Sequence, residues 1–243
     1  MEVKVIGFWG AYPEKGEATS CFLLKKNNYH LIVDLGSGAL SRLQNYIEIK
    51  DIDAVVLSHF HNDHVADVGS FQYACLVQEQ LNQLSVKIPI YAATDSPTAF
   101  KQLNHQATVA RAYDAINPQQ IGPFNITFMK TKHPKPCYAM RIECGDDVIV
   151  YTADTSYFKE LVTFSENADL LIAECSFYKG MNGTKAGHMT SEEVGRLASK
   201  ANVNEVWLSH LPHFGEHQQL FEEASELYQG RMKLAYEGLT WHS

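Results

Sequence analysis

The sequence predicts an α/β protein with a four-layer αββα arrangement, and three observations lead to this prediction. Short apolar runs bounded by glycine, asparagine, aspartate and proline come first along the chain, as is typical of strands. Strand-like and helical segments then alternate, an antiparallel meander follows, and the alternation resumes towards the end. No segment rich in proline, glycine or serine divides the 243 residues, so we expect one domain over residues 1–243.

The first part of the chain is predicted to begin with three strands, followed by alternating helices and buried strands. Asn27-Asn28 is a two-residue turn signal, which predicts a hairpin between the second and third strands. Gly36-Ser37-Gly38 then turns the chain into the first helix. The predicted strands are Val3–Phe8, Ser20–Leu24, Tyr29–Asp34, Ala54–Leu57 and Ile88–Tyr91, and the predicted helices are Ala39–Tyr46, Val68–Leu84 and Ser96–His105.

The second part is predicted to be a meander that returns to alternating helices and strands. Thr190 and Glu193 have the spacing of a capping box, which predicts that a helix begins after Thr190. The predicted strands are Phe124–Lys130, Tyr138–Glu143, Val148–Thr152, Asp169–Ala173 and Glu205–Leu208.

A short internal similarity links the two parts. Val55-Val56-Leu57-Ser58-His59 resembles Val206-Trp207-Leu208-Ser209-His210, and in both segments an apolar strand is followed by Ser-His. Internal duplication and chance similarity between two buried strands both explain a match of this length.

Composition and charge exclude several classes of protein. With 45% hydrophobic and 20% charged residues, the chain is neither disordered nor of low complexity. The net charge of −8 disfavours a dedicated nucleic-acid binder. Five scattered cysteines without a C-x-x-C pair, no signal-peptide pattern and no apolar run of about 18 residues predict a cytoplasmic protein that does not span a membrane.

The most informative segment is His59-Phe60-His61-Asn62-Asp63-His64, an H-x-H-x-D-H pattern directly after a buried strand. It costs free energy to bring three imidazoles and one carboxylate together within six residues unless a cation binds them. These ligand types suit zinc, with manganese or iron as alternatives. The segment therefore predicts a metal site.

Further ligands have to come from elsewhere in the chain. Three candidates, His133, Asp154 and His210, each follow a predicted strand, at the rim where α/β folds place their chemistry. His213 is a rival of His210, but His210 follows its strand directly and is therefore preferred.

In this order, the motif and the three later residues resemble the ligand set of the metallo-β-lactamase superfamily over nearly the whole chain. The resemblance implies that His59, His61 and His133 hold one metal, that Asp63, His64 and His210 hold a second, and that Asp154 bridges them. The flavodiiron branch has Glu at the position of His61, and class B1 lactamases have Cys at the position of Asp154. Neither branch fits this chain.

Shorter motifs are most similar to the ribonuclease Z-like branch. These are Gly187-His188-Met189-Thr190, Ala173-Glu174-Cys175-Ser176 (with Ala173 in place of a His), and the segments 16–20 and 34–38. The tRNA-processing enzymes of this branch carry a basic arm between the distant His and the bridging Asp. Here that interval is only 154 − 133 = 21 residues. With the net acidity, this disfavours long nucleic acid as a substrate.

The resemblance implies a dinuclear zinc hydrolase, and we expect a metal-bridging hydroxide to attack a small or cyclic phosphodiester. Asp63 is expected to hold a metal and to orient the nucleophile or accept its proton. His188 is expected to contact a phosphoryl oxygen or to protonate the leaving oxygen. Glu174 ends an apolar strand, where it would hydrogen-bond a ligand imidazole or cap the backbone. Asp34 is expected to be structural, accepting hydrogen bonds from the metal loop.

Alternative functions come from the same resemblance. A lactone or carboxyl-ester hydrolase would use the same nucleophile, and a tRNA 3′-processing endoribonuclease belongs to the same branch. A glyoxalase II-type thioesterase needs a helical domain after its last ligand, whereas 243 − 210 = 33 residues remain here. A metal-stabilised scaffold would show erosion of the ligand set, and the set is complete. Members of the branch are often dimers, so a homodimer is a further expectation.

Overall fold

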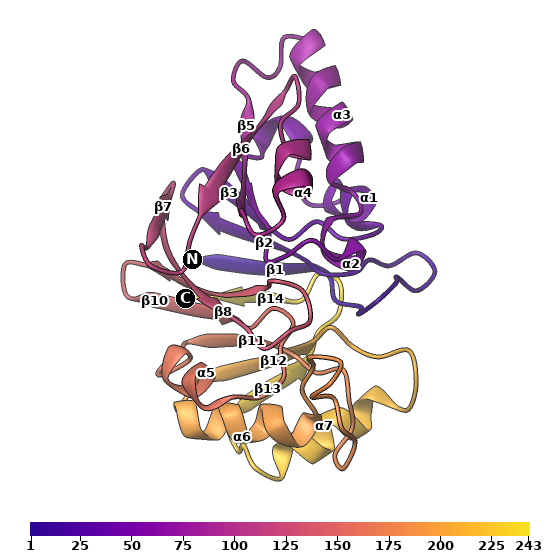
Figure 1. Ribbon diagram of the computed structural model, residues 1–243, viewed down its shortest axis with the longest axis vertical. Helices are drawn as coiled ribbons and strands as arrows, with labels where there is room; N and C mark the ends of the chain where they lie inside the picture. The colour runs from indigo at the N-terminus through magenta and orange to yellow at the C-terminus, as the bar shows by residue number, and fades with distance from the viewer. The chain divides into compact units, whose positions relative to one another are not determined.

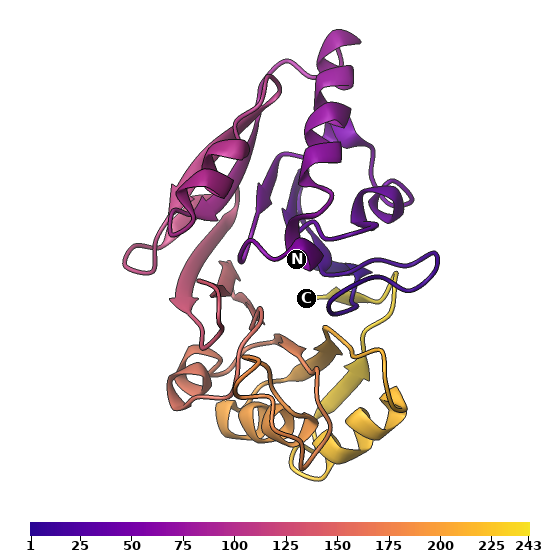
Figure 2. The ribbon, with the colours of Figure 1, turned by 45° about the vertical axis from the view of Figure 1, so that its right-hand side comes forward.

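The computed structural model describes residues 1–243, which form two compact units. One unit comprises Met1–Asp114 together with Tyr236–Ser243, and the other comprises Ala115–Ala235. Each unit contains one seven-stranded mixed sheet with its own helices (Figures 1 and 2). The single domain over residues 1–243 stays a prediction.

The sheet of the first unit has the order β14-β1-β2-β3-β4-β5-β6. The pairs from β14 to β3 are antiparallel, and those from β3 to β6 are parallel, with helices in the connections between the parallel strands. The strands are β1 (Glu2–Gly7), β2 (Cys21–Lys26), β3 (Tyr29–Val33), β4 (Ala54–Val56), β5 (Ile88–Ala93), β6 (Thr108–Tyr113) and β14 (Thr240–His242). The helices are α1 (Ala39–Leu43), η1 (Ile49–Asp51), α2 (Asn62–Val65), α3 (Val68–Gln80) and α4 (Pro97–Gln102).

The sheet of the second unit has the order β13-β12-β11-β10-β9-β8-β7. Its pairs from β7 to β10 are antiparallel, and those from β10 to β13 are parallel. The strands are β7 (Gln119–Ile121), β8 (Phe124–Lys130), β9 (Tyr138–Cys144), β10 (Asp147–Tyr151), β11 (Leu170–Glu174), β12 (Glu205–Ser209) and β13 (Arg231–Leu234). The helices are α5 (Lys159–Phe164), α6 (Ser191–Ala201) and α7 (His217–Ser225).

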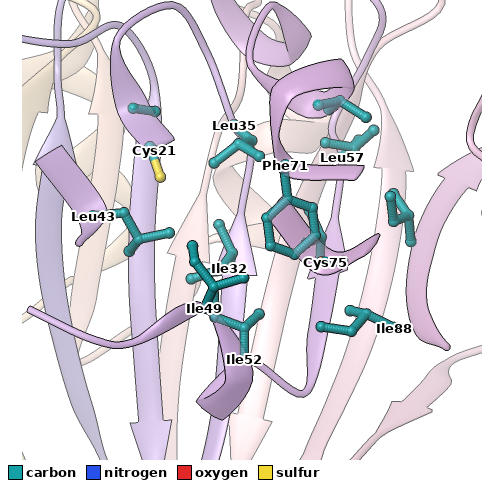
Figure 3. Packing of buried hydrophobic residues seen from close by; sticks show 14 of the residues in the cluster. Cys21, Ile32, Leu35, Leu43, Ile49, Ile52, Leu57, Phe71, Cys75 and Ile88 are labelled. Carbon is teal, nitrogen blue, oxygen red and sulfur yellow. The ribbon is translucent and has the colours of Figure 1, made fainter. Parts of the chain in front are cut away.

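The core of the first unit fixes the strand ends that lead into the metal loop. Phe71 and Cys75 lie one turn apart on α3 and are fully buried, in one cluster with Leu35 and Leu57 (Figure 3). Leu35 follows Asp34 at the end of β3, and Leu57 follows β4 and precedes Ser58 and His59, so the cluster packs beside the start of the predicted metal loop. Burial of a side chain as large as Phe71 contributes about 1.5–3 kcal/mol.

Most predicted elements are confirmed, with differences at their ends. The hairpin turn is Asn27-Asn28, and the capping box is formed because Thr190 Oγ1 accepts from Glu193 N while Glu193 Oε2 accepts from Thr190 N. The predicted end of the helix Val68–Leu84 was too late: α3 ends at Gln80, because Asn82 adopts a left-handed conformation that stops the helix.

The strands that the sequence did not predict are β6, β7, β13 and β14, and all four lie at an edge of a sheet. An edge strand has one neighbour, so it needs no continuous apolar run and its pattern is weak. The helix α7 was also not predicted individually.

The similarity between the two Ser-His segments does not mark equivalent positions. Both sheets run through three antiparallel pairs and then three parallel pairs, yet β4 is the fifth strand of this series and β12 is the sixth. The topology of the two units is repeated, whereas the five-residue match is displaced by one strand.

None of the helices is long and apolar enough to cross a membrane.

Candidate metal centre

The predicted metal loop of the first unit runs from the end of β4 into α2. Leu57 N donates to Tyr91 O of β5 at 2.9 Å, so the chain stays alongside the sheet until it reaches the histidines. His61 is extended and caps α2, which begins at Asn62. This change from extended to helical backbone gathers the side chains of His59, Asp63 and His64, all of them buried.

Asp34, which directly follows β3, organises this loop from within the protein. Its Oδ1 accepts from Ser58 N at 2.7 Å. Its Oδ2 accepts from Ser58 Oγ at 2.7 Å and lies 2.7 Å from His64 Nδ1. Asp34 and His64 are fully buried. A carboxylate behind an imidazole fixes the ring and its tautomer, so the predicted structural role of Asp34 is confirmed.

The hydrogen bonds at Nδ1 determine which ring nitrogen of His59 and of His64 carries the lone pair. His64 donates Nδ1–H to Asp34, which leaves the lone pair on Nε2. Ser58 Oγ donates to Asp34, so it accepts from His59 Nδ1 at 3.0 Å, and His59 Nε2 also carries a lone pair. A neutral imidazole with its lone pair on Nε2 is a form that can bind a metal through that atom.

Two ligand pairs form within this loop. His59 Nε2 lies 3.0 Å from His61 Nδ1. Separately, His64 Nε2 lies 3.7 Å from Asp63 Oδ2, an oxygen that also accepts from Ala11 N at 2.9 Å. The pairing matches the division of these residues between two metals that the resemblance implies.

In the second unit, Asp154 follows β10 and turns its two oxygens to different histidines. Oδ1 lies 3.3 Å from His210 Nε2, and Oδ2 lies 3.8 Å from His133 Nε2. Asp154 is 2% exposed, and its backbone is held by Thr131 Oγ1, which donates to Asp154 O at 2.8 Å. A carboxylate divided in this way is suited to bridge two cations.

His210 is oriented by a hydrogen-bond chain of the same type as His59. Ser176 Oγ donates to Glu174 Oε2 at 3.0 Å and lies 2.9 Å from His210 Nδ1. The order carboxylate, serine hydroxyl and imidazole therefore occurs once in each unit, with Asp34-Ser58-His59 in the first. In both hydrogen-bond chains the serine accepts from Nδ1, which leaves the lone pair of the imidazole on Nε2.

His133 is held by the backbone of the segment around Gly187. Its Nδ1 donates to Gly187 O at 3.1 Å. Gly187 has φ +79°, and a Cβ there would lie 2.7 Å from His133 Nδ1, so only glycine fits. Burial lowers the pKa of His133 below its usual 6.5, against an opposing effect of Asp154, and this favours the neutral ligand form.

His188, the next residue, faces Glu174. His188 Nδ1 lies 3.3 Å from Glu174 Oε1, which also accepts from Met189 N at 2.8 Å. The His188 ring stacks on His210 at 5.2 Å and meets His133 edge-on at 5.3 Å. Ligand atoms of Glu174, His188 and His210 lie within 4.8 Å of one another. The His188 side chain keeps 18% of its surface exposed, whereas that of Glu174 is buried.

The structure brings the sequence-predicted residues together within each unit. His59, His61, Asp63 and His64 cluster in the first unit, and His133, Asp154, Glu174, His188 and His210 cluster in the second. It is His210 that contacts Asp154, as preferred over His213. The complete ligand set and the catalytic assignments stay predictions.

Sequence reasoning missed the two serines that orient ligands. Ser58 directly precedes His59, so its position beside the metal-site motif could have identified it. Ser176 is 34 residues from His210, and no local pattern connects them.

The two mixed sheets with their helices and the two clusters of His and Asp side chains are typical of one class of protein. The comparisons with known proteins identify the same class. Residues 32–211 match the family model of the beta-lactamase superfamily domain. The chain therefore belongs to the metallo-β-lactamase superfamily, and the predicted α/β fold class is confirmed.

One similar protein, known from its sequence and from its crystal structure, specifies the class further. The chain is 46% identical over 242 residues to the "Probable metallo-hydrolase YhfI" of Bacillus subtilis strain 168, covering 99% of both. The crystal structure of YhfI, a metallo-β-lactamase fold protein, matches with a TM-score of 0.98 over 99% of this chain and 98% of that one. The chain is a metallo-hydrolase.

One more distant similarity supports the ribonuclease Z-like branch, and a second concerns the fold alone. Ribonuclease Z of Haloferax volcanii is 21% identical over 302 residues, covering 98% of this chain and 93% of the relative. A diphosphatase from the PhnP family matches with a TM-score of 0.79 at 16% identity, covering 100% of this chain and 97% of that structure, which shows the fold alone.

Proposed function

We propose that the protein is a dinuclear zinc phosphodiesterase that acts on a small or cyclic phosphodiester. The observation that carries the proposal is that, in each unit, the distances separate the proposed ligands into one group for each of the two metals. His59 pairs with His61, and His64 pairs with Asp63. Asp154 separately offers one oxygen towards His133 and the other towards His210.

The donor set fits two zinc ions. One would be held by His59, His61 and His133, the other by Asp63, His64 and His210, and Asp154 would bridge them. Imidazole nitrogens and carboxylate oxygens are zinc ligands, and each of His59, His64, His133 and His210 has its Nδ1 engaged by a carboxylate, a serine or a carbonyl. When bound, such ions lower the pKa of water and stabilise charge on a phosphoryl group.

His188 is the residue that favours a phosphodiester over a carboxyl ester. It lies outside the proposed ligand set, yet Glu174 holds its Nδ1 at 3.3 Å and part of the ring reaches solvent. With its Nδ1 lying 3.3 Å from a buried carboxylate, the ring would use Nε2 to exchange a proton with a leaving oxygen or to donate to a phosphoryl oxygen. Glu174 is then a positioning residue, since its oxygens are directed at Ser176, Met189 and His188.

Asp63 has a second role in the proposal. Its Oδ2 is fixed by the amide of Ala11, and the side chain is largely buried. A carboxylate held in this way keeps one orientation, which allows it to accept the proton of the attacking water.

A small substrate is supported by the segment between His133 and Asp154. The antiparallel pair β9 and β10, joined at a tight turn around Gly145, accounts for most of these residues. No length remains for a basic arm that would hold a long RNA. Since phosphate contacts dominate nucleic-acid affinity, a chain of net charge −8 without such an arm suits a small ligand. A tRNA 3′-processing activity is therefore the weaker alternative.

The test is a metal analysis combined with a substrate panel of bis(p-nitrophenyl) phosphate, cyclic nucleotides, lactones and a thioester. We expect two zinc ions per chain and turnover of the phosphodiesters. Asp154→Asn should lose both zinc and turnover, whereas Asp146→Asn, an exposed turn carboxylate, should retain them. Lactone turnover without phosphodiester turnover would assign the protein to the carboxyl-ester hydrolases instead.

A homodimer is supported by one face of α3. Tyr73, Val77 and Leu81 recur every four residues and are 67%, 48% and 58% exposed. Glu79 is the one charged residue of α3 and is hydrogen-bonded to Gln106, while the exposed residues of the helix are uncharged, so two copies can meet there with little repulsion between like charges. Sedimentation should show a dimer that Val77→Glu dissociates. A monomeric wild-type chain would contradict this assignment.

The cytoplasm is the proposed location. All five cysteines are buried and none forms a disulfide bond, which is the state that a reducing compartment maintains. Mass spectrometry of alkylated protein from the cell should show five reduced thiols.

A further inference from the structure

The loop between β12 and α7 exposes one aromatic ring close in sequence to a proposed ligand. Phe214 follows His210 by four residues and is 47% exposed. Large apolar side chains that stay exposed near a site commonly contact a ligand. The question is whether this ring is a mobile surface residue or is held in place.

The structure holds the backbone of Phe214 firmly. Tyr178 Oη donates to Phe214 O at 2.9 Å, and the two rings pack at 5.7 Å with an angle of 53°. Gly215 has φ +73°, and a Cβ there would lie 2.4 Å from Tyr178 Oη, so glycine is what allows Tyr178 to approach. His217 Nε2 also lies 2.7 Å from Pro212 O and ties the same loop to α7.

A second ring connects Phe214 to His188. Phe177 is half-buried, with its ring centroid 6.4 Å from Phe214 and 6.2 Å from His188. The three rings form a continuous series that begins at the imidazole proposed to contact the phosphoryl group. A ligand with its phosphate at His188 therefore meets an aromatic surface if it carries a second group that extends past Phe177.

We propose that Phe214 and Phe177 form a stacking surface for the nucleobase of a mononucleotide phosphodiester. This inference rests on the proposed function and names its substrate class. Every nucleobase has a π-face, and stacking on an aromatic side chain strengthens binding by about 5- to 150-fold per base. A ring whose backbone is fixed loses little conformational entropy on binding, which makes Phe214 suited to the role.

The experiment compares the binding of two probes that differ only in the base, adenosine 5′-monophosphate and ribose 5-phosphate, by calorimetry. The wild-type protein should bind the nucleotide at least tenfold more tightly. Phe214→Leu keeps an apolar side chain but removes the π-face. It should weaken nucleotide binding about tenfold, consistent with the lower part of the stacking range, and leave ribose 5-phosphate within twofold. Phe214→Trp should restore nucleotide binding.

Tyr236→Leu is the matched control, because it removes an exposed aromatic ring that belongs to the other unit. It should change neither probe. Equal binding of the two probes by the wild-type protein, or equal weakening of both by Phe214→Leu, would overturn the stacking surface.

Turnover of a cyclic adenosine monophosphate separates this inference from the proposed function. If the zinc-loaded protein hydrolyses no phosphodiester but the binding contrast persists, the proposed function fails while the stacking surface stands. If phosphodiesters are hydrolysed but Phe214→Leu leaves nucleotide binding unchanged, the stacking surface alone is wrong.

Discussion

Ser58 and Ser176 occupy the same chemical position in two separate hydrogen-bond chains. Each hydroxyl donates to a buried carboxylate, Asp34 or Glu174, and lies within 3.0 Å of Nδ1 of a histidine, His59 or His210. One chain lies in each unit. Each unit thus orients one predicted ligand imidazole by the same means, although the serines stand at different distances from their histidines in the sequence.

Ser58→Ala and Ser176→Ala should each lower zinc affinity by about tenfold, because the loss of the partner at Nδ1 frees the ring to rotate and change tautomer. Competition with a chelator measures the affinity. Ser165→Ala is the control, since it removes a buried hydroxyl that makes no hydrogen bond. Equal affinities for all four proteins would show that the chains are not needed to orient the ligands.

Asp34→Asn should have a larger effect than either serine variant. Asp34 accepts from Ser58 N and Oγ and from His64 Nδ1, so the change affects both His64 and, through Ser58, His59. We expect zinc affinity to fall by about 10–100-fold. Thermal unfolding of the metal-free protein should also show destabilisation, because a buried charged hydrogen bond is lost. Zinc affinity equal to that of the wild type would contradict the role assigned to Asp34.

His188→Ala should retain two zinc ions but lose about 100-fold in kcat for a phosphodiester with an alkoxide leaving group. The loss should be much smaller for bis(p-nitrophenyl) phosphate, whose leaving group needs no proton. Steady-state kinetics with both substrates measure the difference. Full turnover of the alkoxide substrate by a two-zinc variant would remove His188 from the mechanism.

Gly187→Ala tests the support of His133. A Cβ at this position would lie 2.7 Å from His133 Nδ1, in addition to the strain of a positive φ, whereas at Gly145, with φ +63°, a Cβ meets nothing within 4 Å. Gly145→Ala therefore measures backbone strain alone, about 1–3 kcal/mol. Gly187→Ala should destabilise further and weaken zinc binding, as chemical unfolding and chelator competition would show. Equal effects of the two changes would mean that His133 does not depend on Gly187.

The sequence predicted the residues of each cluster because their signals are local. His59, His61, Asp63 and His64 share one short motif, and Asp154 and His210 each follow a buried strand. The role of Asp34 as an acceptor for the metal loop was also predicted correctly. By contrast, Ser176 reaches His210 across two neighbouring strands, and Gly187 supports His133 over 54 residues. Such contacts depend on tertiary structure, which no local pattern encodes.

Strands could be predicted from the sequence where they lie inside a sheet, with a neighbouring strand on each side. The interior strands β3, β4, β11 and β12 show continuous apolar runs. The edge strand β6, Thr108–Tyr113, contains Arg111 and only moderately apolar residues, and its place is fixed by pairing with β5. Tertiary pairing, rather than local pattern, makes it a strand.

The central claim is that two zinc ions are needed for phosphodiester hydrolysis, and a zinc titration of the metal-free protein tests it most directly. Hydrolysis of a cyclic nucleotide and of a lactone is measured at each addition. Cyclic nucleotide turnover should rise until two equivalents are bound and then stay constant. Turnover that saturates at one equivalent, or lactone hydrolysis without cyclic nucleotide hydrolysis, would contradict it.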